Sequence, residues 1–137
     1  MYPEELVRPM RAQLTGNGFT ELKSVEEVDQ AMNDKEGTQL VVVNSVCGCA
    51  AGSARPGVVH SLTGDKIPSK LYTVFAGQDR DATNKAREYM MPYPPSSPSI
   101  ALFKDGELVH MIERHHIEGR SAEMISANLQ AAYNEHC

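Results

Sequence analysis

The first third of the chain contains two stretches in which apolar residues recur at helical spacing. In the first, residues 6–14, Pro9 lacks a backbone donor, so we expect a late start or a kink there. The second, residues 25–32, follows Ser24, whose hydroxyl can cap a helix while Glu27 reaches back to it. Both patterns predict helices with one apolar face.

Strand patterns appear in the middle of the chain. Residues 39–44 form a continuous β-branched run, which is typical of a strand buried on both faces of a sheet, and residues 71–75 have the same character. A weakly helical stretch, residues 50–62, separates these two strands, and a polar helical stretch, residues 79–91, follows the second one. The order predicts a strand-helix-strand unit with parallel strands.

The last third of the chain predicts a hairpin and a final helix. Residues 99–104 and 107–112 are strand-like and flank Asp105-Gly106, the clearest hairpin signal in the sequence. Ser121 then caps a last helix. Together the elements predict an α/β fold whose central sheet mixes parallel and antiparallel strands, with helices on both faces. This is the thioredoxin-like arrangement, one of several α/β sandwiches with that order.

Composition narrows the class of protein. With 137 residues, 41% apolar and 23% charged, the chain predicts a single domain over residues 1–137. The net charge of −5 argues against a nucleic-acid partner, and no apolar stretch is long enough for a membrane span. Glu4 and Glu5 stand where a signal peptide needs basic residues, so we expect a cytoplasmic protein. In that compartment thiols stay reduced unless they are catalytic or bind metal.

Two of the three cysteines carry the candidate chemistry. Cys47 and Cys49 follow directly on the strand at residues 39–44, where a helix begins and where free backbone amides favour a thiolate. Gly48 allows a tight turn between them and leaves the sulfur accessible to a bulky disulfide. A bridge between cysteines two residues apart closes a small ring, so we expect it to be strained and oxidising. Such a pair is suited to taking over a small-thiol adduct.

A proline at the start of the first hairpin strand is the second candidate feature. In a thioredoxin-like fold this proline has a cis peptide bond and faces the cysteine loop, and Ser97-Pro98 stands at that position. An X–Pro bond tolerates the cis form at a cost of about 0.5–1 kcal/mol. We therefore expect Ser97 and Pro98 to bind substrate, with Ser97 offering its backbone to an incoming peptide or thiol. The alternative is a trans proline in an ordinary proline-rich loop.

Several segments resemble the bacilliredoxin family. They include residues 41–52, which contain the Cys-Gly-Cys-Ala-Ala-Gly sequence, and residues 74–79 and 95–99, and the resemblance runs almost end to end. Members of that family have a thioredoxin-like fold and remove bacillithiol from proteins that were S-thiolated under oxidative stress. Weak disulfide isomerase or reductase activity is also associated with them.

The resemblance implies roles for both cysteines. Cys47 matches the attacking cysteine, which takes bacillithiol as a mixed disulfide, and Cys49 matches the second cysteine; either Cys49 or Cys137 is left as a candidate to resolve the adduct. No cofactor is implied beyond bacillithiol, or a similar small thiol, as co-substrate. The implied partners are S-bacillithiolated client proteins and this thiol, with neither nucleic acid nor membrane.

The chain departs from ordinary thioredoxins near the cysteines. Val46 stands where thioredoxins have tryptophan, and the strand at residues 40–44 holds no acid to act as a buried proton relay. The candidates for proton transfer in place of that acid are Asn44, Ser45 and water. Arg55 lies within about two helical turns of the pair, so we expect either a surface salt bridge or attraction of an acidic thiol there.

Other functions use the same residues. Cys47 and Cys49 with His60 or His110, and with Cys137 as a fourth ligand, would make a metal-binding or metal-delivery protein. A general disulfide isomerase or reductase is a second alternative. A redox-insensitive interaction module is a third, in which neither cysteine matters.

Overall fold

The computed structural model describes residues 1–137 and contains one five-stranded sheet in the order β1-β3-β2-β4-β5. The strands are β1 (Thr20–Glu21), β2 (Thr38–Asn44), β3 (Lys70–Phe75), β4 (Ser99–Lys104) and β5 (Glu107–Ile112). β3 runs parallel to both β1 and β2, whereas β4 is antiparallel to β2 and β5 is antiparallel to β4. The expected mixed sheet is confirmed, and the short strand β1 at its edge is an addition to it.

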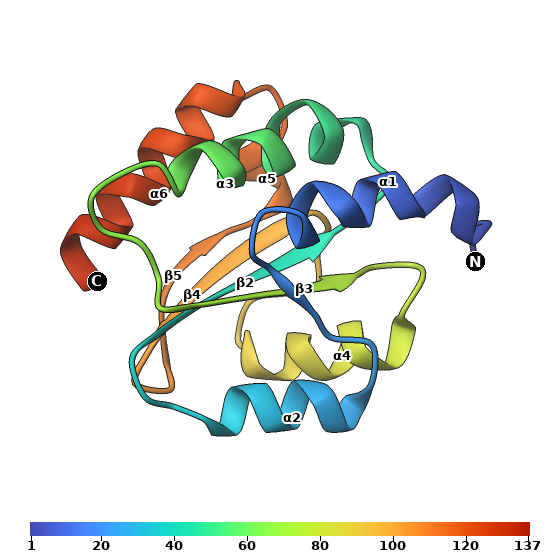
Figure 1. Ribbon diagram of the computed structural model, residues 1–137, viewed down its shortest axis with the longest axis horizontal. Coiled ribbons are helices and arrows are strands. Elements are labelled where there is room, and N and C mark those ends of the chain that lie inside the picture. Colours follow the sequence, from blue (N-terminus) through green and yellow to red (C-terminus); the bar gives the residue numbers. More distant parts are fainter.

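Helices cover both faces of this sheet (Figure 1). They are α1 (Glu4–Thr15), α2 (Val25–Asn33), the π-helical turn η1 (Ala50–Ala54), α3 (Arg55–Ser61), α4 (Arg80–Tyr89), α5 (Arg114–Ile117) and α6 (Ala122–His136). α1, α3 and α6 lie on one face, and α2 and α4 lie on the other. None of these helices is long and apolar enough to cross a membrane.

The central strand β2 explains why its sequence is apolar without alternation. All seven of its residues are buried. Leu40 and Val42 belong to the apolar cluster packed against α3 and α6, whereas Val41 and Val43 belong to the cluster packed against α2 and α4. Because successive side chains of a strand point to opposite faces, a strand covered on both faces needs apolar residues throughout. β2 is thereby fixed inside the protein, with its carboxyl end at the cysteines.

The predicted helix signals are largely confirmed. Ser24 accepts a hydrogen bond of 3.1 Å from the amide of Glu27, and the hydroxyl of Ser121 accepts one of 3.2 Å from the amide of Met124. The expectation of a late start near Pro9 was wrong, since α1 begins at Glu4 and runs through the proline. Proline inside a helix removes one backbone hydrogen bond. Tertiary contacts of α1 outweigh this loss.

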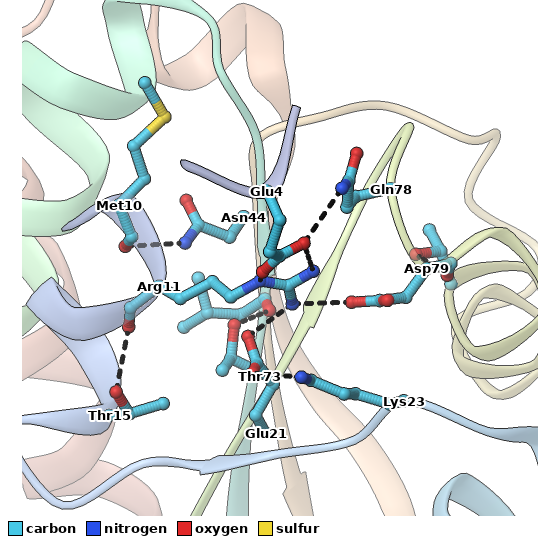
Figure 2. Close-up of polar contacts among 12 residues, drawn as sticks. Glu4, Met10, Arg11, Thr15, Glu21, Lys23, Asn44, Thr73, Gln78 and Asp79 are labelled. Atoms are coloured by element: carbon cyan, nitrogen blue, oxygen red, sulfur yellow. Dashed lines mark hydrogen bonds and ion pairs between the residues drawn. The ribbon is translucent and has the colours of Figure 1, made fainter. Parts of the chain in front are cut away.

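Some of these contacts belong to a group of ion pairs around Arg11 (Figure 2). The guanidinium, on a residue only 6% exposed, contacts Glu4 of the same helix at 2.8 Å, Glu21 of β1 at 2.7 Å and Asp79 before α4 at 2.6 Å. A buried charge needs partners of opposite sign, and here three carboxylates supply them. The group joins α1, the sheet edge and the start of α4.

Candidate active site

Cys47 lies between the end of β2 and the first turn of the following helix. Its carbonyl accepts hydrogen bonds from the amides of Ala50 at 2.9 Å and Ala51 at 3.2 Å, so helical bonding starts at this residue. Its own amide donates to the hydroxyl of Ser45 at 3.0 Å. The predicted position of the cysteine at a strand-to-helix junction is confirmed, and the helix continues through the π-helical turn η1. π-Helical turns are frequent at functional sites.

The two thiols of the Cys-Gly-Cys segment are free, half-buried and in contact. Their sulfur atoms are 2.7 Å apart and share a hydrogen bond. That bond from Cys49 lowers the pKa of the Cys47 thiol, and the nearby amides and the charge of Arg114 act in the same direction against the effect of burial. Burial raises the pKa of the Cys49 thiol, and its hydrogen bond to Cys47 adds to the rise. Cys47 is therefore the more acidic thiol, as a nucleophile requires.

Arg114 is a residue of this site that no motif or spacing along the chain singles out. It begins the short helix α5 after the hairpin, and its Nη1 donates to the carbonyl of Ser97 at 3.1 Å while its Nε contacts Glu118 at 2.5 Å. These two contacts hold the guanidinium beside the thiols. The charges of Cys47 and Cys49 in turn contribute to raising the pKa of Arg114, after the larger effect of Glu118.

Arg55 corrects the expectation of a surface residue. It is 3% exposed, and its Nη1 donates to the side-chain oxygen of Asn44 at 3.0 Å and to the carbonyl of Ser45 at 2.8 Å, while its Nε donates to Gln13. The chain leaves the sheet at this point, so its polar groups lose their ladder partners and need a donor. Arg55 therefore holds the cysteine loop from inside and does not attract ligands from solution.

The peptide bond between Ser97 and Pro98 is cis, as expected. Ser97 lines a cleft of about 430 Å³ together with Cys47, Arg114 and the exposed ring of Tyr2. Its carbonyl accepts one hydrogen bond, from Arg114, and a carbonyl oxygen can accept a second, so binding of a ligand by the backbone of Ser97 stays a prediction. The structure thus brings Ser97 to the cysteines, and Pro98 follows it at the start of β4.

Gly48 has a simpler role than expected. It is helical, its φ is not positive, and a Cβ atom added to it would meet nothing within 4 Å. The turn between the cysteines therefore does not require glycine. Because glycine has no side chain, the space at this position between the two cysteines is open.

The metal-binding alternative lacks ligands in the structure. The ring of His60 is hydrogen-bonded to the hydroxyl of Ser126 at 3.0 Å, and the ring of His110 is hydrogen-bonded to the side chain of Asn128 at 2.7 Å. No group of three potential metal ligands includes either cysteine of the pair, and Cys137 is exposed at the end of α6. The one such group is formed by Glu113, His115 and His116 on the surface.

Comparison with known sequences decides the family. The sequence model of the disulphide isomerase family matches residues 2–137. A bacilliredoxin of Cytophaga hutchinsonii is 63% identical over 135 residues, which are 98% of this chain and 99% of that protein. The chain belongs to the bacilliredoxin family. A second bacilliredoxin, from Halalkalibacterium halodurans, is 60% identical over 136 residues, covering 99% of this chain and 94% of the relative.

Solved structures establish the fold of this bacilliredoxin. The thioredoxin of Fasciola hepatica superposes with a TM-score of 0.60 at 16% identity, over 87% of this chain and 100% of that one. Reduced thioredoxin pre-protein of Schistosoma mansoni superposes with a TM-score of 0.59 at 18% identity, over 88% of this chain and 99% of that one. The thioredoxin-like fold is therefore confirmed. Family membership and fold together identify a thiol-disulfide oxidoreductase.

Proposed function

We propose that this bacilliredoxin removes bacillithiol, or a similar small thiol, from S-thiolated client proteins through a mixed disulfide on Cys47. The observation that carries the proposal is the acidic thiol of Cys47, hydrogen-bonded to Cys49 and facing a cleft of about 430 Å³. A cleft of this size admits a small thiol. A thiol with a lowered pKa is also the better nucleophile toward disulfides. The similarity to relatives named bacilliredoxin supports the proposal.

The proposed first step is one thiol-disulfide exchange. The Cys47 thiolate attacks the bacillithiol sulfur of the client's mixed disulfide, a new S–S bond forms on Cys47, and the client cysteine leaves as a thiolate. No electrons are lost in this step, because the disulfide is only transferred. The amide of Cys47 is held by Ser45, which is itself fixed by buried Arg55, so the attacking residue is oriented before the substrate arrives.

The second step frees Cys47 again. Attack by the Cys49 thiolate releases bacillithiol and leaves a bond between Cys47 and Cys49, which an external reductant must then reduce. Attack by a second bacillithiol instead releases bacillithiol disulfide and restores the Cys47 thiol directly. We favour the second thiol, because the pKa of Cys49 is raised and little of it is thiolate at neutral pH. No cofactor takes part, and we place the reaction in the cytoplasm, where client thiols are kept reduced.

The test uses a single-cysteine client protein carrying bacillithiol, mixed with reduced enzyme and followed by intact mass and peptide mapping. Wild type and Cys49→Ala are both expected to free the client thiol and to keep one bacillithiol on Cys47 until free bacillithiol is added; loss of the adduct from wild type alone would show that Cys49 resolves it. Cys47→Ala is expected to be inactive, and Cys137→Ala to show whether the exposed terminal thiol resolves the adduct. Release of the client by Cys47→Ala would refute the proposed nucleophile.

A general dithiol reductase or isomerase is the alternative that the same experiment separates. Such an enzyme would form the Cys47–Cys49 bridge with any accessible disulfide, and Cys49→Ala would then lose turnover. Equal rates with a protein disulfide and with the bacillithiolated client would favour this broader activity.

A further inference from the structure

The cleft beside Cys47 has an excess of positive charge in a protein whose net charge is −5. Nine residues line it, of which two, Arg87 and Arg114, are cationic and none is acidic. The two arginines come from different elements, the last turn of α4 and the start of α5. Local and overall charge are therefore opposite in sign at this cleft.

Arg87 has no partner within the protein. Its Nε is buried without a hydrogen bond, and none of the ion pairs of the chain involves its guanidinium. The two buried arginines differ from half-buried Arg87, because Arg11 contacts three carboxylates and Arg55 donates to three oxygen atoms. Partial burial lowers the pKa of Arg87, because it removes some of the water around the guanidinium.

Arg114 is held in place on the other element. Its guanidinium is fixed by the carbonyl of Ser97 and by Glu118, close enough to the thiols for its charge to affect both of their pKa values. A ligand disulfide-bonded to Cys47 would occupy the same cleft as the two guanidinium groups. Guanidinium binds carboxylates in a planar, often bidentate geometry, and hydrogen bonds between charged groups are among the strongest in proteins.

We propose that Arg87 and Arg114 bind a carboxylate of the small thiol while its sulfur is bonded to Cys47, and so select acidic small thiols over neutral or basic ones. This inference rests on the proposed function and adds the determinant of its specificity. Many small thiols built on cysteine carry a carboxylate, which a guanidinium pairs with well. Binding of that group would give Arg87 the partner that the protein itself does not supply.

The exchange that reports on this site is simple. The Cys47 thiolate attacks one sulfur of a small symmetric disulfide, forms the mixed disulfide, and releases the other half as a thiolate. Dithiodipropionate carries a carboxylate on each half, hydroxyethyl disulfide is neutral, and cystamine carries an ammonium on each half. The quantity to compare is the ratio of the rates of Cys47 adduct formation for the anionic and the neutral disulfide, measured by intact mass.

In wild type we expect dithiodipropionate to react faster, relative to hydroxyethyl disulfide, than cystamine does. This preference for the anionic disulfide is expected to decrease at high salt. Arg87→Gln is expected to lower it by about tenfold, the size of one charge-assisted hydrogen bond. Arg87→Lys keeps the charge and is expected to retain most of the preference. Arg80→Gln removes an exposed charge from the same helix and is the matched control, expected to keep the wild-type ratio.

Four outcomes count against the inference. An unchanged ratio in Arg87→Gln, or a fall as large in Arg80→Gln, would overturn it. Equal wild-type rates with all three disulfides would overturn it as well, while leaving the proposed function intact. If none of the disulfides formed an adduct on Cys47, the proposed function itself would fail, and the inference with it.

Discussion

The sulfur atoms of Cys47 and Cys49 lie 2.7 Å apart, and their hydrogen bond has opposite effects on the two thiols. It lowers the pKa of Cys47 by stabilising the thiolate and adds to the raised pKa of Cys49 by keeping that proton in place. The pair is thus asymmetric although both residues lie in one short segment. Cys47 is the sulfur whose thiolate is stabilised, and Cys49 serves as its donor.

Removing the donor is expected to make Cys47 less acidic. In Cys49→Ala the thiolate of Cys47 loses its main stabilising hydrogen bond, so its pKa rises and the pH profile of its alkylation by iodoacetamide moves to higher pH. Cys49→Ser retains a hydroxyl donor and is expected to move the profile less. Mass spectrometry of the modified peptide measures both. A profile that stays in place in Cys49→Ala would show that the hydrogen bond does not control the reactivity of Cys47.

Arg55→Met tests whether the buried guanidinium holds the cysteine loop. The substitution leaves the carbonyl of Ser45 without a donor, and the side-chain oxygen of Asn44 keeps only the amide of Ser45, so we expect the free energy of unfolding to fall by about 2–4 kcal/mol. We also expect the alkylation rate of Cys47 to change. Arg55 holds the carbonyl of Ser45, and the hydroxyl of Ser45 accepts a hydrogen bond from the amide of Cys47. Urea unfolding and iodoacetamide kinetics measure the two effects. Arg80→Met, at an exposed position, is the control for losing a charge.

Arg11→Met is expected to destabilise the protein in a pH-dependent way. At pH 7 the loss of the cation leaves three neighbouring carboxylates without their partner, at a cost of about 3–5 kcal/mol. The hydrogen bond to Arg11 lowers the pKa of Glu4, so the stability gained from this pairing is present above the usual carboxyl pKa and is lost as pH falls through the lowered one. The difference between wild type and variant should therefore shrink in acid. Urea unfolding at neutral and acidic pH measures it, and a constant difference would contradict the assignment.

Gly57→Ala should reveal how tightly α3 packs on α6. A Cβ atom at this position would lie 2.7 Å from Cβ of Ile125 and 3.0 Å from the carbonyl oxygen of Ala122, so we expect a loss of about 1–3 kcal/mol from overpacking. Gly52→Ala is the matched control, because a Cβ atom there meets nothing within 4 Å. Alanine favours helical conformation over glycine by roughly 0.5–1 kcal/mol, so the control is expected to keep or gain stability. Thermal unfolding distinguishes the two variants.

The features that sequence predicted correctly have local or strongly periodic signals. The buried run of β2, the Asp105-Gly106 hairpin and the caps at Ser24 and Ser121 each depend on residues close together in the chain. Cys47 was placed correctly for the same reason, since it directly follows a strand whose burial is visible in its composition. The cis bond before Pro98 was expected from the fold class and is present.

The features that sequence missed depend on distant contacts. β1 has only two polar residues, and it is a strand because it pairs with Tyr72 and Thr73 of β3. Arg114 reaches the cysteines only after the hairpin has folded, so no spacing along the chain points to it. Arg55 is buried because loop carbonyls surround it, whereas an arginine near a helix is ordinarily solvent-exposed. For the same reason, the sequence does not show that Arg87 lacks an ion-pair partner, because that depends on which residues the fold brings near it.

The cleft beside Cys47 is assembled from segments that are far apart in the chain. Tyr2 precedes α1, Cys47 follows β2, Gly77 follows β3, and Ser97 and Arg114 flank the hairpin. A partly folded chain could keep its cysteines and still lack the walls that surround them. The proposed selectivity among small disulfides would therefore require the completed tertiary structure, and its recovery during refolding would report when the last of these segments has docked.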